Sequence, residues 1–241
     1  MAGKQVHQKV VNSLMRDIFA NKLHAGEKLP PERELSKAMD VDRTSLRVAL
    51  KQLESMNLLD IRPGDGIYVK DFLKHAGIDF LRLLFSQDDD ASAELISDKY
   101  VIDEVWEWWA AIFPEMIKLA ARRLSARDLK ALGELFDREM ESINDRQRII
   151  ELEIAEQDLV ATVANNMIML LISNSSRPMR RKIVEIFINS IEKEALVEFI
   201  STKKNLMREY LLDPKADYDA AAEHYRGIIN SHRQMVRRAL S

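Results

Sequence analysis

Glycine and proline, the residues that most often interrupt regular structure, are unevenly distributed along this 241-residue chain. The first 80 residues hold eight of the thirteen, and the next 161 residues hold five. We therefore expect frequent turns near the N-terminus and long helices in the remainder, which gives a mainly α fold. The five later positions are Pro114, Gly133, Pro178, Pro214 and Gly227.

The first 70 residues contain the periodicities of three helices and a hairpin. Apolar residues between 5 and 20 follow a helical stripe, Pro31 suits the start of a short helix, and Asp42 suits an N-cap. Two β-type runs follow, separated by Arg62-Pro63-Gly64-Asp65-Gly66, which has the composition of a tight turn. This order predicts a winged helix-turn-helix domain over residues 1–72. The expected helices are 5–20, 31–39 and 41–53, and the expected strands are 58–61 and 67–69.

Beyond residue 72 the apolar pattern is helical throughout, with no strand pattern. It predicts an all-α bundle over residues 73–241. The Met167–Ile172 run is expected to be buried inside it, and the polar stretches 87–90 and 173–176 are expected to be breaks. The expected helices are 73–86, 91–123, 125–145, 147–173, 177–211 and 215–239.

Several chemistries are excluded by composition. The chain has no cysteine, which rules out disulfides, thiolate zinc sites and cysteine nucleophiles. The N-terminus lacks the apolar segment of a secretory signal, and the apolar runs are far shorter than a membrane span. We expect a cytoplasmic protein with no membrane partner.

The net charge of −3 conceals two regions of opposite sign. Residues 1–70 carry a net charge of +3, and the remainder carries −6. A basic N-terminal domain can approach phosphates while an acidic domain is repelled by them.

The predicted helix 41–53 places polar groups where they can meet DNA. In a helix-turn-helix, the first turns of the second helix reach base edges in the major groove. Arg43, Thr44, Ser45 and Arg47 occupy those turns, and Arg33 opens the preceding helix. Arginine pairs with guanine, and hydroxyl groups reach phosphate or thymine. The alternative is that these arginines lie on an ordinary solvated helix face.

The turn around Gly64 and Gly66 is the second candidate contact with DNA. Because glycine has no side chain, the backbone there can approach the sugar-phosphate chain or the minor groove closely.

These segments resemble the DNA-binding domain of the GntR family of bacterial transcription regulators. The resemblance covers about residues 6–70 and is carried by the runs 26–35, 41–50 and 62–69. It implies that Arg33, Arg43, Thr44 and Arg47 contact operator DNA and that the wing at Gly64 enters the minor groove. Two positions depart from the family pattern: Pro31 replaces a small capping residue, and Asp65 places negative charge at the wing tip.

The helical part resembles the effector domain of the FadR (fatty-acid regulator) subfamily, the FCD-like antiparallel bundle of six or seven helices. The most similar segment is 152–166, where Ala164-Asn165-Asn166 resembles a family turn. Many members hold a divalent metal through one Asp and three His. By family spacing those four positions carry Glu153, Gln157, Asn205 and Gly227, so the histidines are missing.

Because glutamine, asparagine and glycine are poor metal ligands, we expect no metal and no other cofactor. The resemblance then implies an acyl-CoA or a small carboxylic acid as effector, with Glu153, Gln157 and Asn205 as effector-binding residues. Ordinary hydrogen bonding within the bundle is the alternative for these three.

Three further groups of residues have simple structural interpretations. Trp106 and Trp109 share a helix face with apolar residues, which favours core or dimer contacts over ligand stacking. His224 and His232 are expected to be solvated or packing residues. The cluster Arg180-Arg181-Lys182 is expected to be solvated, and the alternative is that it holds a phosphate or carboxylate of an effector.

The leading hypothesis is a homodimeric, ligand-responsive regulator that binds a pseudopalindromic operator in double-stranded DNA. We expect no enzyme activity and no catalytic residue, because no nucleophile–base pair and no phosphate loop are recognisable. The alternatives are an enzyme whose site lies in the bundle, with the DNA-binding domain appended, and a constitutive DNA binder without an effector.

Overall fold

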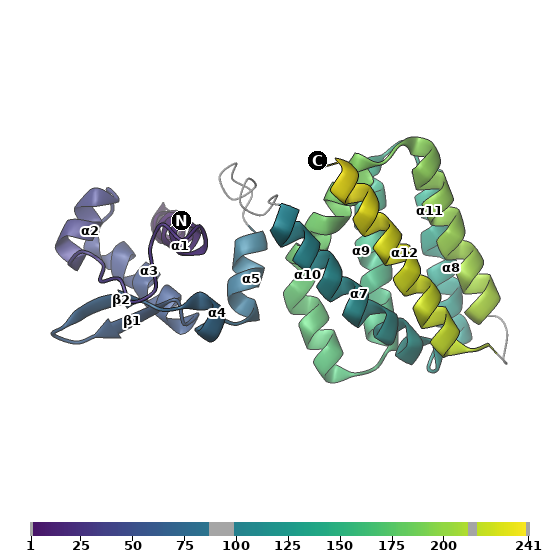
Figure 1. Cartoon of the computed structure of the whole chain (residues 1–241), viewed down its shortest axis with the longest axis horizontal. Helices are drawn as coiled ribbons and strands as arrows, with labels where there is room; N and C mark the ends of the chain where they lie inside the picture. Colours follow the sequence, from purple (N-terminus) through teal and green to yellow (C-terminus); the bar gives the residue numbers. More distant parts are fainter. Residues whose placement is uncertain (1, 87–98, 212–215, 240–241) are drawn as a thin grey trace. The chain divides into compact units, whose positions relative to one another are not determined.

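The computed structural model describes residues 2–86, 99–211 and 216–239, which fall into two compact units, Met1–Ile96 and Ser97–Ser241 (Figure 1). Within the residues that the structure describes, the first unit contains five short to medium helices and a two-stranded hairpin, and the second is helical. The fold is mainly α, with an N-terminal winged helix-turn-helix, as the sequence predicts.

Three helices form the core of the first unit: α1 (Ala2–Phe19), α2 (Glu32–Ala38) and α3 (Arg43–Ser55). α1 packs against α3, and both contribute their apolar stripes to one buried core. The backbone turns between α2 and α3 at Asp40, which has φ +52°, a conformation that an aspartate tolerates better than most residues. The buried residues include Val10, Val11, Leu14, Met15 and Ile18 from α1, and Leu46, Ala49, Leu50 and Leu53 from α3.

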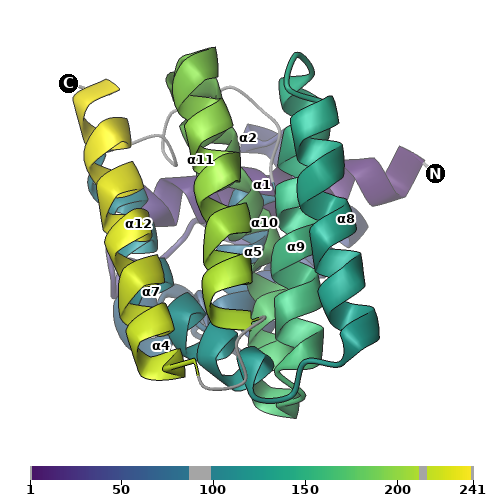
Figure 2. The same ribbon diagram turned by 90° about the vertical axis from the view of Figure 1, so that its right-hand side faces the viewer.

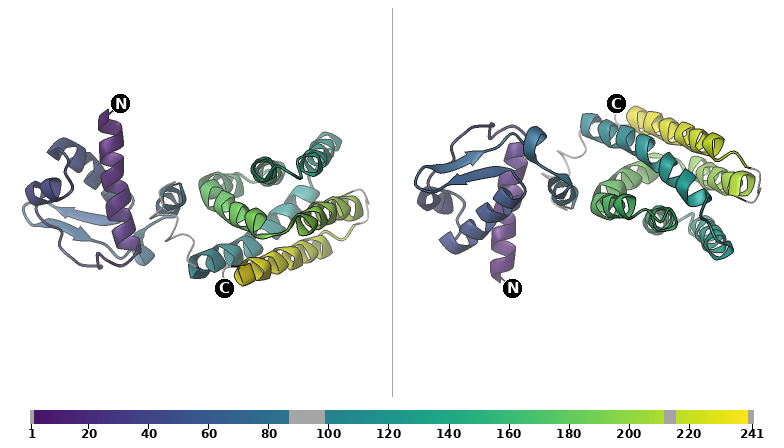
Figure 3. Two further views of the ribbon diagram at one scale, coloured as in Figure 1. Left: turned by 90° about the horizontal axis from the view of Figure 1, so that it is seen from above. Right: turned by 90° about the horizontal axis from the view of Figure 1, so that it is seen from below.

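The strands β1 (Leu59–Arg62) and β2 (Gly66–Val69) pair in antiparallel register. Leu59 lies opposite Val69, and Arg62 lies opposite Gly66 at the turn. Ile67 and Val69 are buried against the helices, so the predicted wing is attached to the core of the unit. Figure 3 shows the hairpin at the edge of this unit from above and below.

Two more helices belong to the first unit, α4 (Phe72–His75) and α5 (Ile78–Phe85). The rings of Phe19, Phe72 and Phe80 lie 5.6–6.2 Å apart and tie these helices to α1. The single helix predicted over 73–86 is therefore wrong, because the backbone is extended at Gly77 (φ −115°, ψ −170°) and divides it. The two compact units divide between Ile96 and Ser97, whereas the sequence analysis sets the domain boundary between residues 72 and 73.

The second unit is a helical bundle whose long helices run alongside one another (Figure 2). α7 packs on α12, and α9 packs on both α8 and α10. None of the described helices, in either unit, is long and apolar enough to cross a bilayer. The elements are α7 (Lys99–Ala121), α8 (Ala126–Glu141), α9 (Arg146–Val163), α10 (Met167–Ser190), α11 (Lys193–Leu206), the π-helical turn η1 (Met207–Leu211) and α12 (Tyr218–Ala239).

The break between the middle helices lies elsewhere than predicted. α10 runs through Ser173–Ser176, where the sequence indicates a break, and the turn falls earlier, between α9 and α10. Asn165 adopts φ +46° there, and the Asn166 side chain accepts a hydrogen bond from the Met169 N–H. An asparagine pair that supplies a left-handed residue and an N-cap is a stronger stop than serines inside a helix. The predicted break at 87–90 and the start of the helix predicted from 91 lie outside the described residues.

The apolar run at the start of α10 is not buried. Met167 is 71% exposed and Leu171 is 55% exposed, and Ile168 and Ile172 are also exposed. The prediction of a buried segment is wrong because the first turns of α10 lie on the outside of the bundle within this chain.

Aromatic side chains fill the centre of the bundle. Trp106 and Trp109 are buried, as predicted, and the Trp109 ring stacks on Phe113 with centroids 4.2 Å apart. Trp106 meets Phe187 of α10 edge-on, at 6.1 Å. These contacts identify both tryptophans as core residues.

Candidate nucleic-acid interface and interior polar cluster

The outer face of α3 carries the side chains that the sequence singles out. Arg43, Thr44 and Arg47 are exposed, while Leu46 and Leu50 hold the opposite face in the core. Val48 is also 50% exposed and lies one turn after Thr44. Val48 is not among the residues predicted from the sequence, although an exposed valine on a polar helix face is a signal for a contact surface. The face therefore offers guanidinium, hydroxyl and methyl groups together.

The start of α3 is fixed by a side-chain cap. Asp42 accepts hydrogen bonds from the Ser45 N–H at 2.9 Å and from the Ser45 hydroxyl at 2.6 Å. These bonds hold the pKa of Asp42 below its usual value, and the bond from the Ser45 hydroxyl has the largest effect. The Asp42 cap is confirmed, and the Ser45 hydroxyl is engaged in it, so Ser45 serves the helix start in this structure.

One ion pair joins α3 to α2. The Arg47 Nε donates to the Glu32 Oε2 at 2.7 Å, and the Arg47 side chain remains 67% exposed. Arg33, the next residue of α2, is exposed. Pro31 precedes α2 as its N-cap residue and offers no side-chain cap.

The wing turn depends on its two glycines. Gly64 has φ +77° and Gly66 has φ +150°, both unfavourable for residues with a Cβ. A Cβ at Gly66 would also lie 2.4 Å from the Lys28 Cε, whereas at Gly64 the space is open. The turn therefore presents backbone at Gly64 and keeps Lys28 close at Gly66.

The negative charge at the wing tip is surrounded by positive groups. The Tyr68 hydroxyl donates to the Asp65 Oδ1 at 2.9 Å, and Lys28 and Arg62 lie 3.5 and 3.8 Å from its carboxylate. The Tyr68 hydrogen bond, aided by these charges, lowers the pKa of Asp65. Arg62 also pairs with Asp60 at 2.8 Å, so two exposed cations balance two carboxylates and the wing is not a net acidic surface.

The second unit contains a buried ionic cluster. The Lys203 Nζ of α11 lies 3.1 Å from the Glu139 Oε2 of α8 and 2.5 Å from the Glu156 Oε2 of α9, and it also contacts Glu153. All four residues are at most 5% exposed. We call Glu139, Glu153, Glu156 and Lys203 the Lys203 cluster.

Burial and charge shift the pKa values in this cluster. Burial raises the pKa of Glu139 to about 7, although the Lys203 charge opposes the rise. It also raises the pKa of Glu156 well above its usual value. Burial alone would lower the pKa of Lys203, but the three carboxylates raise it. The lysine is therefore charged.

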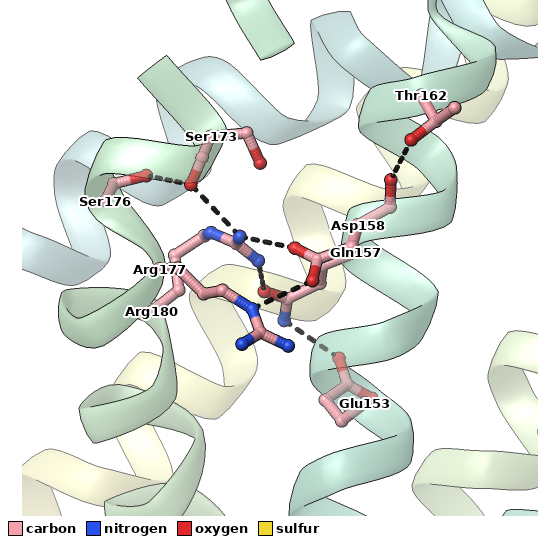
Figure 4. A network of polar contacts seen from close by, with 8 residues as sticks. All are labelled: Glu153, Gln157, Asp158, Thr162, Ser173, Ser176, Arg177 and Arg180. Carbon is pink, nitrogen blue, oxygen red and sulfur yellow. Dashed lines mark hydrogen bonds and ion pairs between the residues drawn. The ribbon is translucent and has the colours of Figure 1, made fainter. Parts of the chain in front are cut away.

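A hydrogen-bond network extends from the cluster to α10 (Figure 4). Gln157 donates to Glu153 at 3.2 Å and accepts from Arg180 at 2.7 Å, and Arg180 also donates to Asp158 at 2.7 Å. Arg180 is 0% exposed, so the prediction that it is solvated is wrong. Its two acceptors on α9 and the Ser173 carbonyl on α10 compensate its burial.

Two cavities adjoin the cluster. One, of about 70 Å³, has apolar walls from α7, α8, α9, α11, η1 and α12, with Glu156, Lys203 and Tyr225 as polar groups. The other, of about 30 Å³, is lined by Glu153, Gln157, Trp106 and Tyr225 among others. The larger one combines an apolar body with a small polar end, which is the usual form of a ligand pocket.

Comparison with known proteins identifies the first unit. Residues 6–69 match the family described as "Bacterial regulatory proteins, gntR family". Residues 6–69 are a GntR-family domain.

The similarity to named proteins extends beyond the GntR domain. The HTH-type transcriptional regulator Mce2R of Mycobacterium tuberculosis is 36% identical over 121 residues, 50% of this chain and 48% of that protein. The fatty acid metabolism regulator protein of Shewanella pealeana is 26% identical over 183 residues, 76% of this chain and 72% of the relative. The chain spans about half the length of several curated relatives that it matches.

A solved structure shares the fold of both units. It is described as "Lar controls the expression of the Listeria monocytogenes agr system and mediates virulence", and the alignment covers 99% of this chain and 97% of that one. The TM-score is 0.61 at 16% identity, a likeness of fold alone.

The structure brings some of the predicted bundle residues together and leaves others outside. Glu153 and Gln157 meet in the interior, whereas Asn205 and Gly227 are exposed. The inward-facing groups are Lys203 and Tyr225, each two residues earlier. Spacing from a family motif selects positions along the chain but does not determine which of them face the interior, so Lys203 and Tyr225 are not predicted from the sequence.

The residues present do not fit the divalent metal that the FadR resemblance implies. Glu139, Glu153 and Glu156 offer oxygens within 4.8 Å of one another, but the Lys203 ammonium stands among them. An ammonium at hydrogen-bond distance from these oxygens excludes a metal ion at 2.0–2.6 Å from them.

The two histidines of α12 have the roles expected from the sequence. His232 is buried against Phe187 and Phe199, with ring centroids at 4.2 and 4.8 Å, and His224 is exposed. Burial, with a smaller effect of the Lys203 charge, lowers the pKa of His232 to about 3.

Proposed function

We propose that this chain is a bacterial transcription regulator of the cytoplasm that binds operator DNA as a homodimer and responds to a small-molecule effector. The observation that carries the proposal is the GntR domain with the exposed face of α3. Two copies would read the two halves of a pseudopalindrome, because each half-site meets one recognition helix. Named relatives that are HTH-type regulators support this function over an enzyme.

In this proposal α3 enters the major groove. Arg43 and Arg47 lie where guanidinium groups can pair with guanine, and Thr44 and Val48 lie where methyl groups can meet thymine. Arg33 of α2 contacts phosphate or a neighbouring base, and Ser45 supports the helix start with its backbone near the DNA. We propose that Lys28 and Arg62, besides Gly64 and Gly66, bring the wing to the minor groove.

The exposed start of α10 supports the dimer. Met167, Ile168, Leu171 and Ile172 form an apolar helix face that water contacts in the single chain. Such a face is typical of a contact between protein chains, and a second copy would cover it. Leu171→Glu should then shift the protein from dimer to monomer in sedimentation, while exposed Met235→Glu on α12 should not.

The 70 Å³ cavity supports an effector site in the second unit. At its polar end, the Tyr225 hydroxyl is a hydrogen-bond donor suited to the oxygens of a carboxylate. Of the effectors that the resemblance implies, the cavity size favours a small carboxylic acid over an acyl-CoA. Glu153 and Gln157 support this end from the neighbouring cavity.

A gel-shift titration with the full chain tests the DNA-binding function. Genomic fragments selected by the wild type provide the operator, and Arg43→Ala with Arg47→Ala should weaken binding about 100-fold, since each base contact contributes about 1–3 kcal/mol. The control is Lys22→Ala with Lys74→Ala, which removes the same charge from positions that are 75% exposed outside α3. Equal affinities of both double variants would contradict the proposal.

The effector is tested separately by thermal unfolding with small carboxylic acids and acyl-CoAs, since a ligand stabilises the state that binds it. A compound that raises the Tm should lose its effect in Tyr225→Phe, which removes one donor of the cavity. If the compound still raises the Tm of both Tyr225→Phe and Glu156→Gln, it binds outside this cavity.

A further inference from the structure

The carboxylates of the Lys203 cluster are arranged like the ligands of a cation. Their oxygens lie within 4.8 Å of one another, although they come from two helices, α8 and α9. Opposite edges of the coordination shell of a divalent ion are separated by about this distance, because each metal–oxygen bond measures roughly 2.0–2.6 Å. Carboxylates repel one another when buried, so this grouping requires a positive charge between them.

That charge is supplied by the chain itself. The Lys203 ammonium has three N–H donors and three carboxylate partners, Glu139, Glu153 and Glu156. The rings of Phe136 and Phe199 lie 5.2 and 4.6 Å from the Nζ, which adds cation–π attraction on the remaining sides. Each N–H therefore has a carboxylate acceptor, and two aromatic rings lie close to the ammonium.

A metal ion cannot be added to this arrangement without displacing the lysine. Lys203 is 2% exposed. The buried Gln157–Arg180 hydrogen bond adjoins the cluster through Glu153. Moving the ammonium away would leave a buried charge without a partner, which is strongly destabilising.

We propose that Lys203 is the resident cation of the helical domain and occupies the place among Glu139, Glu153 and Glu156 that a divalent metal ion would otherwise take. The domain then needs no metal ion to fold. Replacing Lys203 should allow the three carboxylates to bind a divalent metal ion. Oxygen-only ligands favour Mn²⁺ among transition metals, and this makes Mn²⁺ the appropriate probe.

The test compares thermal unfolding of the full chain in EDTA and in excess Mn²⁺. The wild type should show no change in Tm. Lys203→Gln and Lys203→Ala should be stabilised by Mn²⁺ by roughly 5 °C or more at 100 times the Kd. The control is Lys204→Gln, whose parent side chain pairs with Asp137 outside the cluster and should leave the response absent.

Each outcome bears on the proposal. A rise in the wild-type Tm with Mn²⁺ that is lost in Glu153→Gln would overturn it, as would folded Lys203 variants that do not respond to Mn²⁺. If both variants are unfolded in EDTA, Mn²⁺ should restore their helical circular dichroism, and failure to do so also overturns it. None of these measurements uses DNA, so their outcome is independent of whether the proposed regulator function is correct.

Discussion

The Arg47 Nε donates a 2.7 Å hydrogen bond to the Glu32 Oε2, and this pair links the outer face of α3 to the first residue of α2. Both groups are accessible to solvent, so the pair holds the guanidinium in place without burying it. If Arg47 contacts DNA as proposed, a phosphate or base must compete with Glu32 for this arginine. In that proposal the carboxylate opposes DNA binding both by its charge and by its ion pair with Arg47.

Glu32→Gln should strengthen DNA binding several-fold, with a steeper dependence on salt, because it frees a cation and removes a repulsive charge. The matched control is Glu54→Gln, which breaks the 2.7 Å pair of Lys51 near the other end of α3. Gel-shift titrations at two salt concentrations measure both. If the two variants bind alike, Glu32 does not restrain Arg47 at the interface.

His232 should make the fold sensitive to mild acid. Its pKa is about 3 in the folded chain and near 6.5 when unfolded, so below pH 6.5 the unfolded state binds more protons. The stability that neutral His232 provides is complete above pH 6.5 and falls as the pH drops toward 3. Between pH 7.5 and 5.0 this amounts to about 2 kcal/mol.

Urea unfolding at pH 7.5 and 5.0 checks this value. His232→Phe keeps aromatic contact with Phe187 and Phe199 and should lose this part of the pH dependence. His224→Phe changes an exposed histidine of the same helix and should keep it. An unchanged pH dependence in His232→Phe would show that the acid response arises elsewhere.

The parts of the fold that the sequence predicts correctly are those with local causes. Asp42 caps α3, and the Pro63–Gly66 turn joins two strands, because a cap and a turn each depend on residues a few positions apart. Apolar periodicity likewise places Leu46 and Leu50 in the core.

What the sequence does not predict depends on distant partners. Arg180 and Lys203 are typical surface residues by type, and each has an equally basic exposed or partly exposed neighbour in the chain. Their burial follows from acceptors on α9 that only the packed bundle brings together. Similarly, Lys203 and Tyr225 face the interior, whereas Asn205 and Gly227, the positions that spacing selects, are exposed.

Asp103 should contribute to stability through its arginine partners on α12. It accepts from Arg233 at 2.6 Å and from Arg237 at 2.5 Å, and these bonds hold its pKa well below the usual value. Because the folded pKa is lowered, this stability is complete above pH 4, the unfolded value, and is lost as the pH falls further.

Asp103→Asn should therefore lower the Tm at pH 6 and reduce the additional loss between pH 4 and 2.5. Glu107→Gln provides the control, because Glu107 also contacts Arg233 at 3.0 Å but is 71% exposed. Differential scanning calorimetry at several pH values distinguishes them. Equal losses of Tm in the two variants would show that the more buried Asp103 contributes no more to stability than the exposed Glu107.

Two glycines should respond to alanine in opposite directions. Gly227 lies inside α12, where a Cβ meets nothing within 4 Å, so Gly227→Ala should stabilise the chain by about 1 kcal/mol through helix propensity. Gly66→Ala should destabilise the first unit by about 1–3 kcal/mol, because φ +150° is strained for alanine and the Cβ displaces Lys28. Urea unfolding measures both, and DNA affinity should fall only for Gly66→Ala, since only that residue belongs to the wing. A stabilised Gly66→Ala variant with unchanged DNA binding would show that the turn does not need its glycine.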